Sequence, residues 1–140
     1  MDWTTKFARF AKRLLKVEYF IWLTTVDPTG KPQPRPVWFV WQDDSVLIFS
    51  QPAAHKVKHI QQNPNVSLHF NTEDTLGDKR VVIFTGRAVI DAATPPAHTV
   101  RAYMRKYKSG IQGLNMTPSQ FAQEYSCAIR ITPANLRGWE

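Results

Sequence analysis

The sequence predicts a single, mainly β domain, in which six antiparallel strands form a small barrel with helices packed outside it. Three observations predict this architecture. The chain has 140 residues, which is the length of one ordinary domain. Hydrophobic residues make up 43% of the chain and aromatic residues 12%, which is enough to fill a core. Runs of β-branched and aromatic residues, separated by short turn signals, outnumber the stretches with helical periodicity.

The amino-terminal stretch, residues 3–16, is predicted to form an amphipathic helix. Its apolar side chains recur at the spacing of one helix face: Trp3, Phe7, Phe10 and Leu14. Basic residues lie between them, and Asp2 can serve as the N-cap. We expect this helix to lie outside the barrel.

The next three apolar runs predict an antiparallel meander, with strands at 19–26, 33–41 and 46–50. A turn at 27–30 joins the first two, because its proline presets φ and its glycine can take a positive φ. Alternate prolines, Pro32, Pro34 and Pro36, begin the second strand and place it at an edge or at a ligand-facing rim.

The second half of the chain alternates helices and strands. Strands are predicted at 66–70, 81–90 and 127–132, and helices at 54–62, from 94 to the glycines at 110 and 113, and from 118 to about 125. Residues 71–79 form a polar loop. Gly86 indicates a β-bulge, and Thr117 with Gln120 forms a capping box.

Charge and cysteine content restrict the function classes. The net charge of +7 suits nucleic acid, acidic lipid or a phosphorylated small molecule. No apolar run reaches the roughly 20 residues of a membrane-spanning helix, and no signal peptide is evident. Cys127 is the single cysteine, so an intramolecular disulfide is impossible and a reducing, cytoplasmic location is expected.

Several kinds of catalytic and metal motif are absent. The sequence has no glycine-rich phosphate loop, no nucleophile elbow and no cysteine pair for zinc. His55 and His59 share a helix face, but no third ligand accompanies them. We therefore expect no metal site and interpret both as surface histidines.

An anion site is predicted where the helix at 54–62 begins. Helix amino termini present unsatisfied amides and the positive end of the dipole. Lys56 in the first turn is unfavourable for the helix unless an anion binds there, and Arg35 on a neighbouring strand can add a bidentate contact. The alternative is that Lys56 simply points into water.

In its order of motifs, the sequence resembles the pyridoxamine 5′-phosphate oxidase-like flavoproteins, which share the FMN-binding split β-barrel. Within them it is most similar to the small oxidoreductase subgroup that includes users of the deazaflavin coenzyme F-420. The matching segments are 22–25, 30–39, 47–50, Lys56, Ile60, 63–66, 86–88 and 137–139. They extend over nearly the whole chain, so the resemblance implies one FMN-binding split-barrel domain over residues 1–140.

The resemblance also implies roles for individual residues. Lys56 would bind the ribityl phosphate with Ser50 and Gln51 nearby, and His55 stands where the oxidase itself has an arginine. Arg35 matches a position at the phosphate end of the cofactor. The isoalloxazine ring would be bordered by Pro36, Val37 and Trp38, although Trp38 alternatively suits a dimer-interface core. Trp139 would close the pocket, from the second subunit of a homodimer with its cofactor sites at the interface.

Four functions remain open at this point. The first is an FMN-dependent oxidoreductase that transfers hydride to or from a small organic substrate. The second is a coenzyme F-420-dependent reductase, and the third is a flavin-binding module without turnover. Binding of single-stranded nucleic acid is the remote fourth, because the tryptophans and the cations lie on different elements. No membrane partner is expected.

Overall fold

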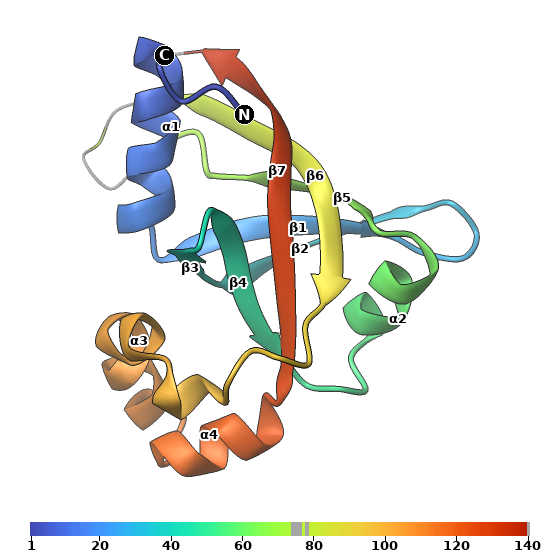
Figure 1. Ribbon diagram of the computed structural model, residues 1–140, viewed down its shortest axis with the longest axis vertical. Coiled ribbons are helices and arrows are strands. Elements are labelled where there is room, and N and C mark those ends of the chain that lie inside the picture. The colour runs from blue at the N-terminus through green and yellow to red at the C-terminus, as the bar shows by residue number, and fades with distance from the viewer. Residues whose placement is uncertain (74–76, 78, 140) are drawn as a thin grey trace.

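The computed structural model describes residues 1–73, 77 and 79–139, and it contains one curled antiparallel sheet (Figure 1). The strands are β1 Phe20–Val26, β2 Pro32–Trp38, β3 Val40–Gln42, β4 Ser45–Ser50, β5 Asn65–His69, β6 Val81–Ile90 and β7 Cys127–Trp139. Their order in the sheet is β2-β1-β5-β6-β7-β4-β3. The helices are α1 Lys6–Val17, α2 His55–Gln62, a 3-10 turn at Ala97–Thr99, α3 Arg101–Gly113 and α4 Pro118–Glu124. The mainly β prediction is confirmed, although the described residues form seven strands where six were expected.

The additional strand arises because the run predicted at 33–41 divides at Phe39. The backbone N–H of Phe39 donates to the hydroxyl of Tyr107 at 2.7 Å, and its carbonyl accepts from Nζ of Lys106 at 2.8 Å. Side chains of α3 therefore replace the ladder bonds at this residue. Before it, β2 pairs with β1, and after it, β3 pairs with β4 at the opposite edge of the sheet. The run predicted at 33–41 therefore pairs with both of its predicted neighbours, but as two strands at opposite edges of the sheet and not as the middle strand of a meander. The sheet curls because these two edge strands are consecutive in the chain.

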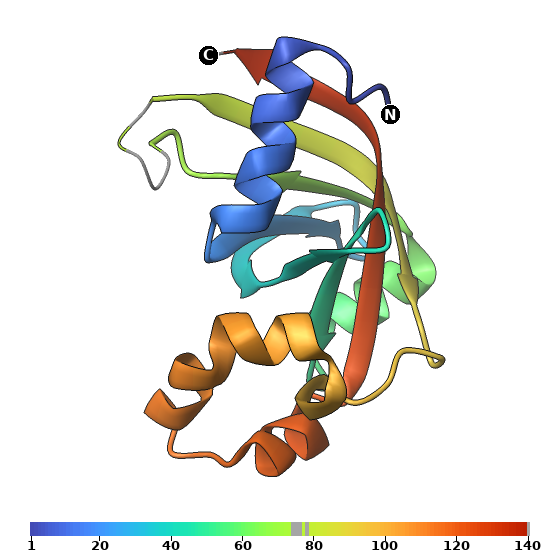
Figure 2. The ribbon, with the colours of Figure 1, turned by 60° about the vertical axis from the view of Figure 1, so that its left-hand side comes forward.

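Helix α1 begins later than predicted. The hydroxyl of Thr5 accepts from the N–H of Ala8 at 3.1 Å and caps the helix, whereas Asp2 accepts from the N–H of Thr4. Trp3 precedes the helix and packs edge-on against Trp41. Residues 2–5 thus precede the helix, and Thr5 caps it. Helix α1 covers one end of the curled sheet (Figure 2).

Helix α3 differs from its prediction at both ends. It begins at Arg101, after two prolines and a 3-10 turn, and it runs through Gly110 to Gly113. A Cβ at Gly110 would lie 2.4 Å from the hydroxyl of Tyr19 and 2.8 Å from the indole of Trp38. Gly110 is therefore a point of close approach within the helix rather than its end. The following helix, α4, has the predicted capping box of Thr117 and Gln120.

The last strand is longer than the predicted 127–132. It pairs with β6 as far as Trp139, and the register shifts between Thr85 and Gly86, which confirms the predicted bulge. A Cβ at Gly86 would overlap the carbonyl oxygen of Thr132, so the close approach of β6 and β7 at the bulge requires glycine. The helix and strand at 54–62 and 66–70 agree with α2 and β5 within one or two residues. Of the predicted polar loop, residues 74–76 and 78 lie outside the described residues.

The interior divides into two clusters. One fills the curl of the sheet beneath α1, with Leu15, Leu23 and Phe84 fully buried. The other lies between the sheet and α3 and α4, with Tyr103, Tyr107 and Phe121 buried. This second cluster, which is rich in aromatic residues, forms one wall of the candidate site.

Candidate cofactor site

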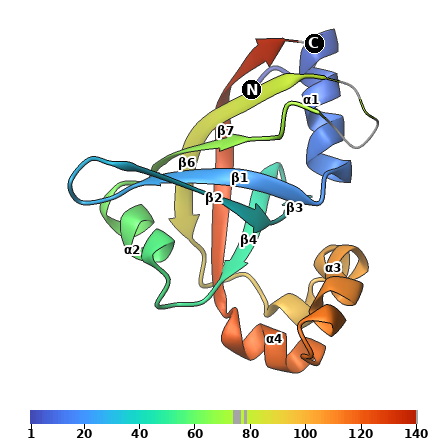
Figure 3. The ribbon, with the colours of Figure 1, turned by 180° about the vertical axis from the view of Figure 1, so that it is seen from behind.

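A cavity of about 280 Å³ opens between β2, β4, the start of α2 and the α3–α4 pair. In the rear view of Figure 3, β2 and β4 lie between α2 on one side and α3 and α4 on the other. Its polar lining comes from Ser50 and Lys56, and its apolar lining comes largely from aromatic residues. The lining residues are Pro36, Val37, Trp38, Phe49, Ser50, Lys56, Tyr103, Leu114, Phe121 and Tyr125.

Two cations meet at the polar side of this cavity. Burial lowers the pKa of Lys56, and the nearby guanidinium of Arg35 lowers it further. Burial also lowers the pKa of Arg35. Within the described part of the chain, neither side chain has a hydrogen-bond or ion-pair partner. Two half-buried positive charges that face one another without a counter-charge lower the stability of the fold. An anion bound between them would offset this loss.

Helix α2 holds Lys56 in place. Its N-cap is Ala54, whose side chain cannot accept from the first-turn amides, and no acidic residue stands in that turn. Nδ1 of His59 lies 2.9 Å from the hydroxyl of Thr25, and both residues are buried. This contact ties α2 to β1 one turn beyond Lys56. The surface interpretation of His59 is therefore wrong, whereas His55 is exposed as expected.

The aromatic wall is organised by Trp38. Its indole stacks on Tyr107 with ring centroids 4.7 Å apart and on Phe121 at 5.9 Å, and Tyr19 meets it edge-on. Trp38 thereby fastens α3 and α4 to the end of β2. The ring is only partly buried and also lines the cavity.

The structure brings most of the predicted site residues together. Arg35 to Trp38, Ser50 and Lys56 lie at one cavity or beside it. Gln51 follows Ser50 and its Nε2 donates to Glu124 Oε1 at 2.8 Å, which ties the site to α4. Trp139 is 67% exposed and ends β7 beside α1, at the opposite end of the molecule from α2 and α4 (Figure 1). Within one chain, Trp139 does not reach the cavity.

Sequence reasoning did not identify the residues that α3 and α4 contribute to the cavity: Tyr103, Leu114, Phe121 and Tyr125. Burial raises the pKa of Tyr103, so this phenol stays protonated. Cys127 was also missed as a neighbour of the site. Cys127 stands opposite Ser50 in the β4–β7 ladder, and the positive charge of Lys56 lowers the pKa of its thiol. Only the helical spacing of Tyr103 and Tyr107 pointed to a buried face here.

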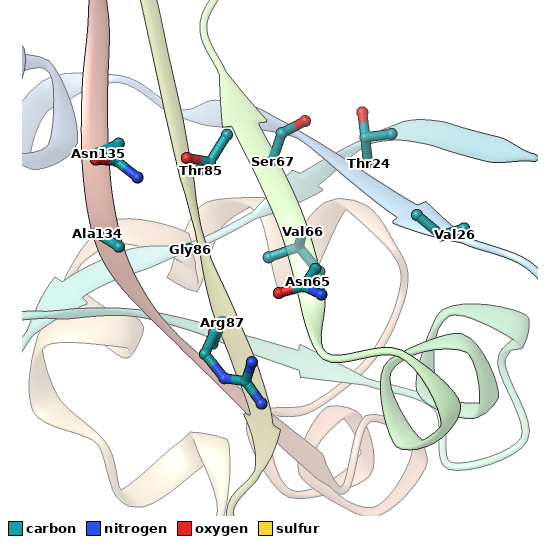
Figure 4. A pocket seen from close by; sticks show the side chains of 10 residues that line it. All are labelled: Thr24, Val26, Asn65, Val66, Ser67, Thr85, Gly86, Arg87, Ala134 and Asn135. Carbon is teal, nitrogen blue, oxygen red and sulfur yellow. The ribbon is translucent and has the colours of Figure 1, made fainter. Parts of the chain in front are cut away.

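A larger hollow of about 480 Å³ lies on the outer face of β1, β5, β6 and β7 (Figure 4). Hydroxyl and amide side chains line it around the Gly86 bulge, with Arg87 as its one cation among the described residues. It lacks both the paired positive charges and the aromatic wall. We therefore assign the candidate site to the smaller cavity.

The described residues contain no group of three or more histidine, cysteine, aspartate or glutamate side chains placed to hold a metal ion. None of their helices combines the length and apolar character needed to cross a bilayer.

A curled antiparallel sheet whose edge strands are consecutive, with helices outside it, defines a split β-barrel protein. A family model described as pyridoxamine 5′-phosphate oxidase matches residues 7–140. The chain therefore belongs to the pyridoxamine 5′-phosphate oxidase family, as its sequence motifs indicated. No protein of curated function matches the sequence.

Solved structures share this fold at low sequence identity. The conserved hypothetical protein Rv2991 from Mycobacterium tuberculosis is 20% identical with a TM-score of 0.75, over 98% of this chain and 86% of that one. An F420 reductase is 22% identical with a TM-score of 0.66, over 90% and 94%. HutZ, the haem storage protein from Vibrio cholerae, is 16% identical with a TM-score of 0.63, over 92% of each chain. These identities establish the shared fold alone.

Proposed function

We propose that the cavity beside Lys56 binds the phosphate end of a flavin-type cofactor, FMN in the first instance. The protein would then be an oxidoreductase that transfers hydride to or from a small organic substrate. One observation carries the proposal: Arg35 and Lys56 are half-buried, near one another, and without an acidic partner among the described residues. Membership of the pyridoxamine 5′-phosphate oxidase family supports it.

The polar groups of the site fit a phosphate. A phosphate dianion between Arg35 and Lys56 would neutralise both charges and accept bidentate hydrogen bonds from the guanidinium. The uncapped first turn of α2 offers backbone N–H donors on the same side. The hydroxyl of Ser50, which now donates to the carbonyl of Gln51 at 3.0 Å, is close enough to turn toward such a ligand.

The apolar part of the cavity fits a planar ring. Val37, Phe49 and Tyr103 provide a wall with few polar groups, and the stack around Trp38 keeps that wall rigid. When bound, a flavin supplies the hydride chemistry, and the protein supplies position and exclusion of water. Here α3 and α4 exclude water from one side, and Lys56 and Arg35 fix the depth of the ligand.

Exposed apolar side chains favour a homodimer, in which a second copy would cover the cavity. The exposed Phe20 and Trp139 are apolar groups that such a partner would cover. We propose that the Trp139 of one subunit closes the cavity of the other.

Coenzyme F-420 carries a comparable ring and phosphate, so it remains the alternative cofactor for the same cavity. Titration with each compound distinguishes the two.

The test is the visible spectrum of the purified protein, followed by titration with FMN and then with F-420. We expect saturable binding of FMN, and weakening by about tenfold or more in Lys56→Gln and in Arg35→Gln. Lys58→Gln is the matched control, because Lys58 is exposed on the same helix. The proposal would be contradicted if neither FMN nor F-420 binds, or if all three variants bind FMN with equal affinity.

Turnover requires a separate assay, because binding alone also fits a flavin module without catalysis. The reduced cofactor would be mixed with a panel of small oxidised acceptors and its absorbance followed. Oxidation faster than in free solution would support an enzyme. If no acceptor accelerates it and an oligonucleotide binds in a salt-dependent manner, the nucleic-acid alternative gains support instead.

A further inference from the structure

A second convergence of positive charge lies away from the cofactor cavity. A groove of about 270 Å³ runs between α1 and α3, which flank the short strand β3 (Figure 2). Its floor is apolar, formed by Leu15, Val40 and Trp41. Its cations, Lys16, Arg105 and Lys106, come from both helices. We call it the α1–α3 groove.

Lys106 is the fixed member of this cluster. Its ammonium lies 3.8 Å from the ring centroid of Phe39 and donates to the carbonyl of that residue at 2.8 Å. Burial lowers its pKa, and Glu18 is the acidic residue close enough to oppose that effect. One of its three protons is used by the carbonyl, which leaves donors for a ligand in the groove.

A purely structural role explains only part of this arrangement. Lys106 donates a hydrogen bond to the carbonyl of Phe39, which lies between β2 and β3. That structural role does not require other cations nearby. It does not explain why Lys16 and Arg105 line the same groove, since like charges repel one another. No acidic residue stands among the lining residues. With Glu18 as the acidic residue near Lys106, the three cations still give the groove an excess of positive charge above an apolar floor.

We propose that the α1–α3 groove is a second ligand site, which binds a small organic anion. The carboxylate or phosphate of the ligand lies among Lys16, Arg105 and Lys106, and its apolar body rests on Val40 and Trp41. Both anionic groups suit the same cations, because ammonium and guanidinium donate to either. The apolar floor selects against inorganic anions and against fully polar acids.

This site is independent of the proposed cofactor site. The two cavities share no lining residue. Removal of Arg35 and Lys56 would abolish the cofactor's phosphate contacts and leave the groove intact. The double variant Arg35→Gln/Lys56→Gln is therefore the background in which groove binding is measured.

The probes are phenyl phosphate and benzoate, with benzyl alcohol as their neutral analogue. In the double-variant background, calorimetry should detect saturable binding of both anions and none of the alcohol. The NMR signal of the Trp41 indole N–H should shift along the same titration curve. Failure of both anions to bind, or equal binding of benzyl alcohol, would overturn the proposal.

Exposed positions provide variants that do not threaten the fold. Lys16→Gln/Arg105→Gln should weaken phenyl phosphate binding by about tenfold or more, with an unchanged unfolding midpoint. Lys108→Gln, which changes an exposed cation on the same helix, should bind as the parent does. Undiminished binding in the first variant, or an equal loss in the second, would show that general surface charge and not the groove attracts the anion.

Discussion

The hydroxyl of Thr25 and Nδ1 of His59 lie 2.9 Å apart, and both residues are buried. This polar contact, together with the buried Val57 and Ile60, holds α2 against the sheet and so contributes to the position of Lys56. Thr25→Val should leave the histidine nitrogen without this partner and lower the free energy of unfolding by about 1–3 kcal/mol. FMN affinity should fall as well, because α2 is held less firmly. Urea unfolding and cofactor titration measure the two effects.

Thr24→Val is the control for this substitution. Thr24 is the neighbouring residue on β1, but it faces the outer hollow and is only partly buried. Its stability change should stay within about 0.5 kcal/mol, with FMN affinity unaltered. Equal losses in the two valine variants would show that the Thr25–His59 contact has no special role.

Gly110 and Gly113 stand in the same helix but in different surroundings. Gly110→Ala should destabilise the protein by about 1–3 kcal/mol, because the new methyl group would overlap Tyr19 and Trp38. Gly113→Ala meets nothing within 4 Å and should be neutral or stabilising by up to about 1 kcal/mol. Thermal unfolding of both variants provides the measurement. A stabilising alanine at 110 would disprove the close approach.

The ionisation of Lys106 should make stability depend on pH. Burial lowers its pKa from 10.5 to about 8. The folded state therefore releases this proton more readily than the unfolded chain, and the buried charge destabilises the fold below about pH 8. That penalty disappears as the pH rises through the window from about 8 to 10.5.

We therefore compare the parent with Lys106→Gln by urea unfolding from pH 7 to 10.5, in buffers without organic anions. The free energy of unfolding of the parent relative to the variant should increase with pH between about 8 and 10.5. Lys16 and Arg105 share the groove and Glu18 lies nearby, but all three are present in both proteins. A difference that stays constant across the window would contradict the assignment.

Cys127 can report on the charge of Lys56 without any cofactor. Burial raises the pKa of its thiol, and the charge of Lys56 opposes that effect. Lys56→Gln should therefore slow alkylation by iodoacetamide, since less thiolate is present. Because the chain has one cysteine, the mass increase of the whole protein measures the rate. Lys58→Gln should react as the parent does, and bound FMN should protect the thiol in the parent.

Mixed dimers test whether Trp139 acts across a subunit boundary. Lys56→Gln and Trp139→Ala should each weaken FMN binding when present in both subunits. In a dimer with one subunit of each kind, one site would carry both defects and the other would carry neither. Size-exclusion chromatography followed by titration should then show tight binding at half of the sites. Weak binding at every site of the mixed dimer would mean that Trp139 does not complete the partner's cavity.

Local sequence signals predicted several elements correctly. The helix expected over 54–62 ends before the Asn63-Pro64 pair, Gly86 forms a bulge, and Thr117 with Gln120 caps α4. Each signal acts through the backbone conformation or hydrogen bonds of residues close in the chain, so no knowledge of the fold is needed. The helix start and the resemblance likewise predicted an anion site at Lys56 and Arg35, and the structure brings these two side chains near one another.

The tertiary structure decided what depends on contacts distant in sequence. Phe39 interrupts a strand because Tyr107 binds its backbone from 68 residues away. Position 110 within α3 suits glycine because Tyr19 and Trp38 occupy the space that a side chain would need. Composition and periodicity therefore predicted a mainly β barrel, which the structure confirms. The anion site beside α2 stays a prediction, drawn from the lysine at the start of that helix and from the family resemblance. Long-range packing alone decided how the sheet curls and which aromatic rings face that site, because such contacts leave no local pattern in the residues that make them.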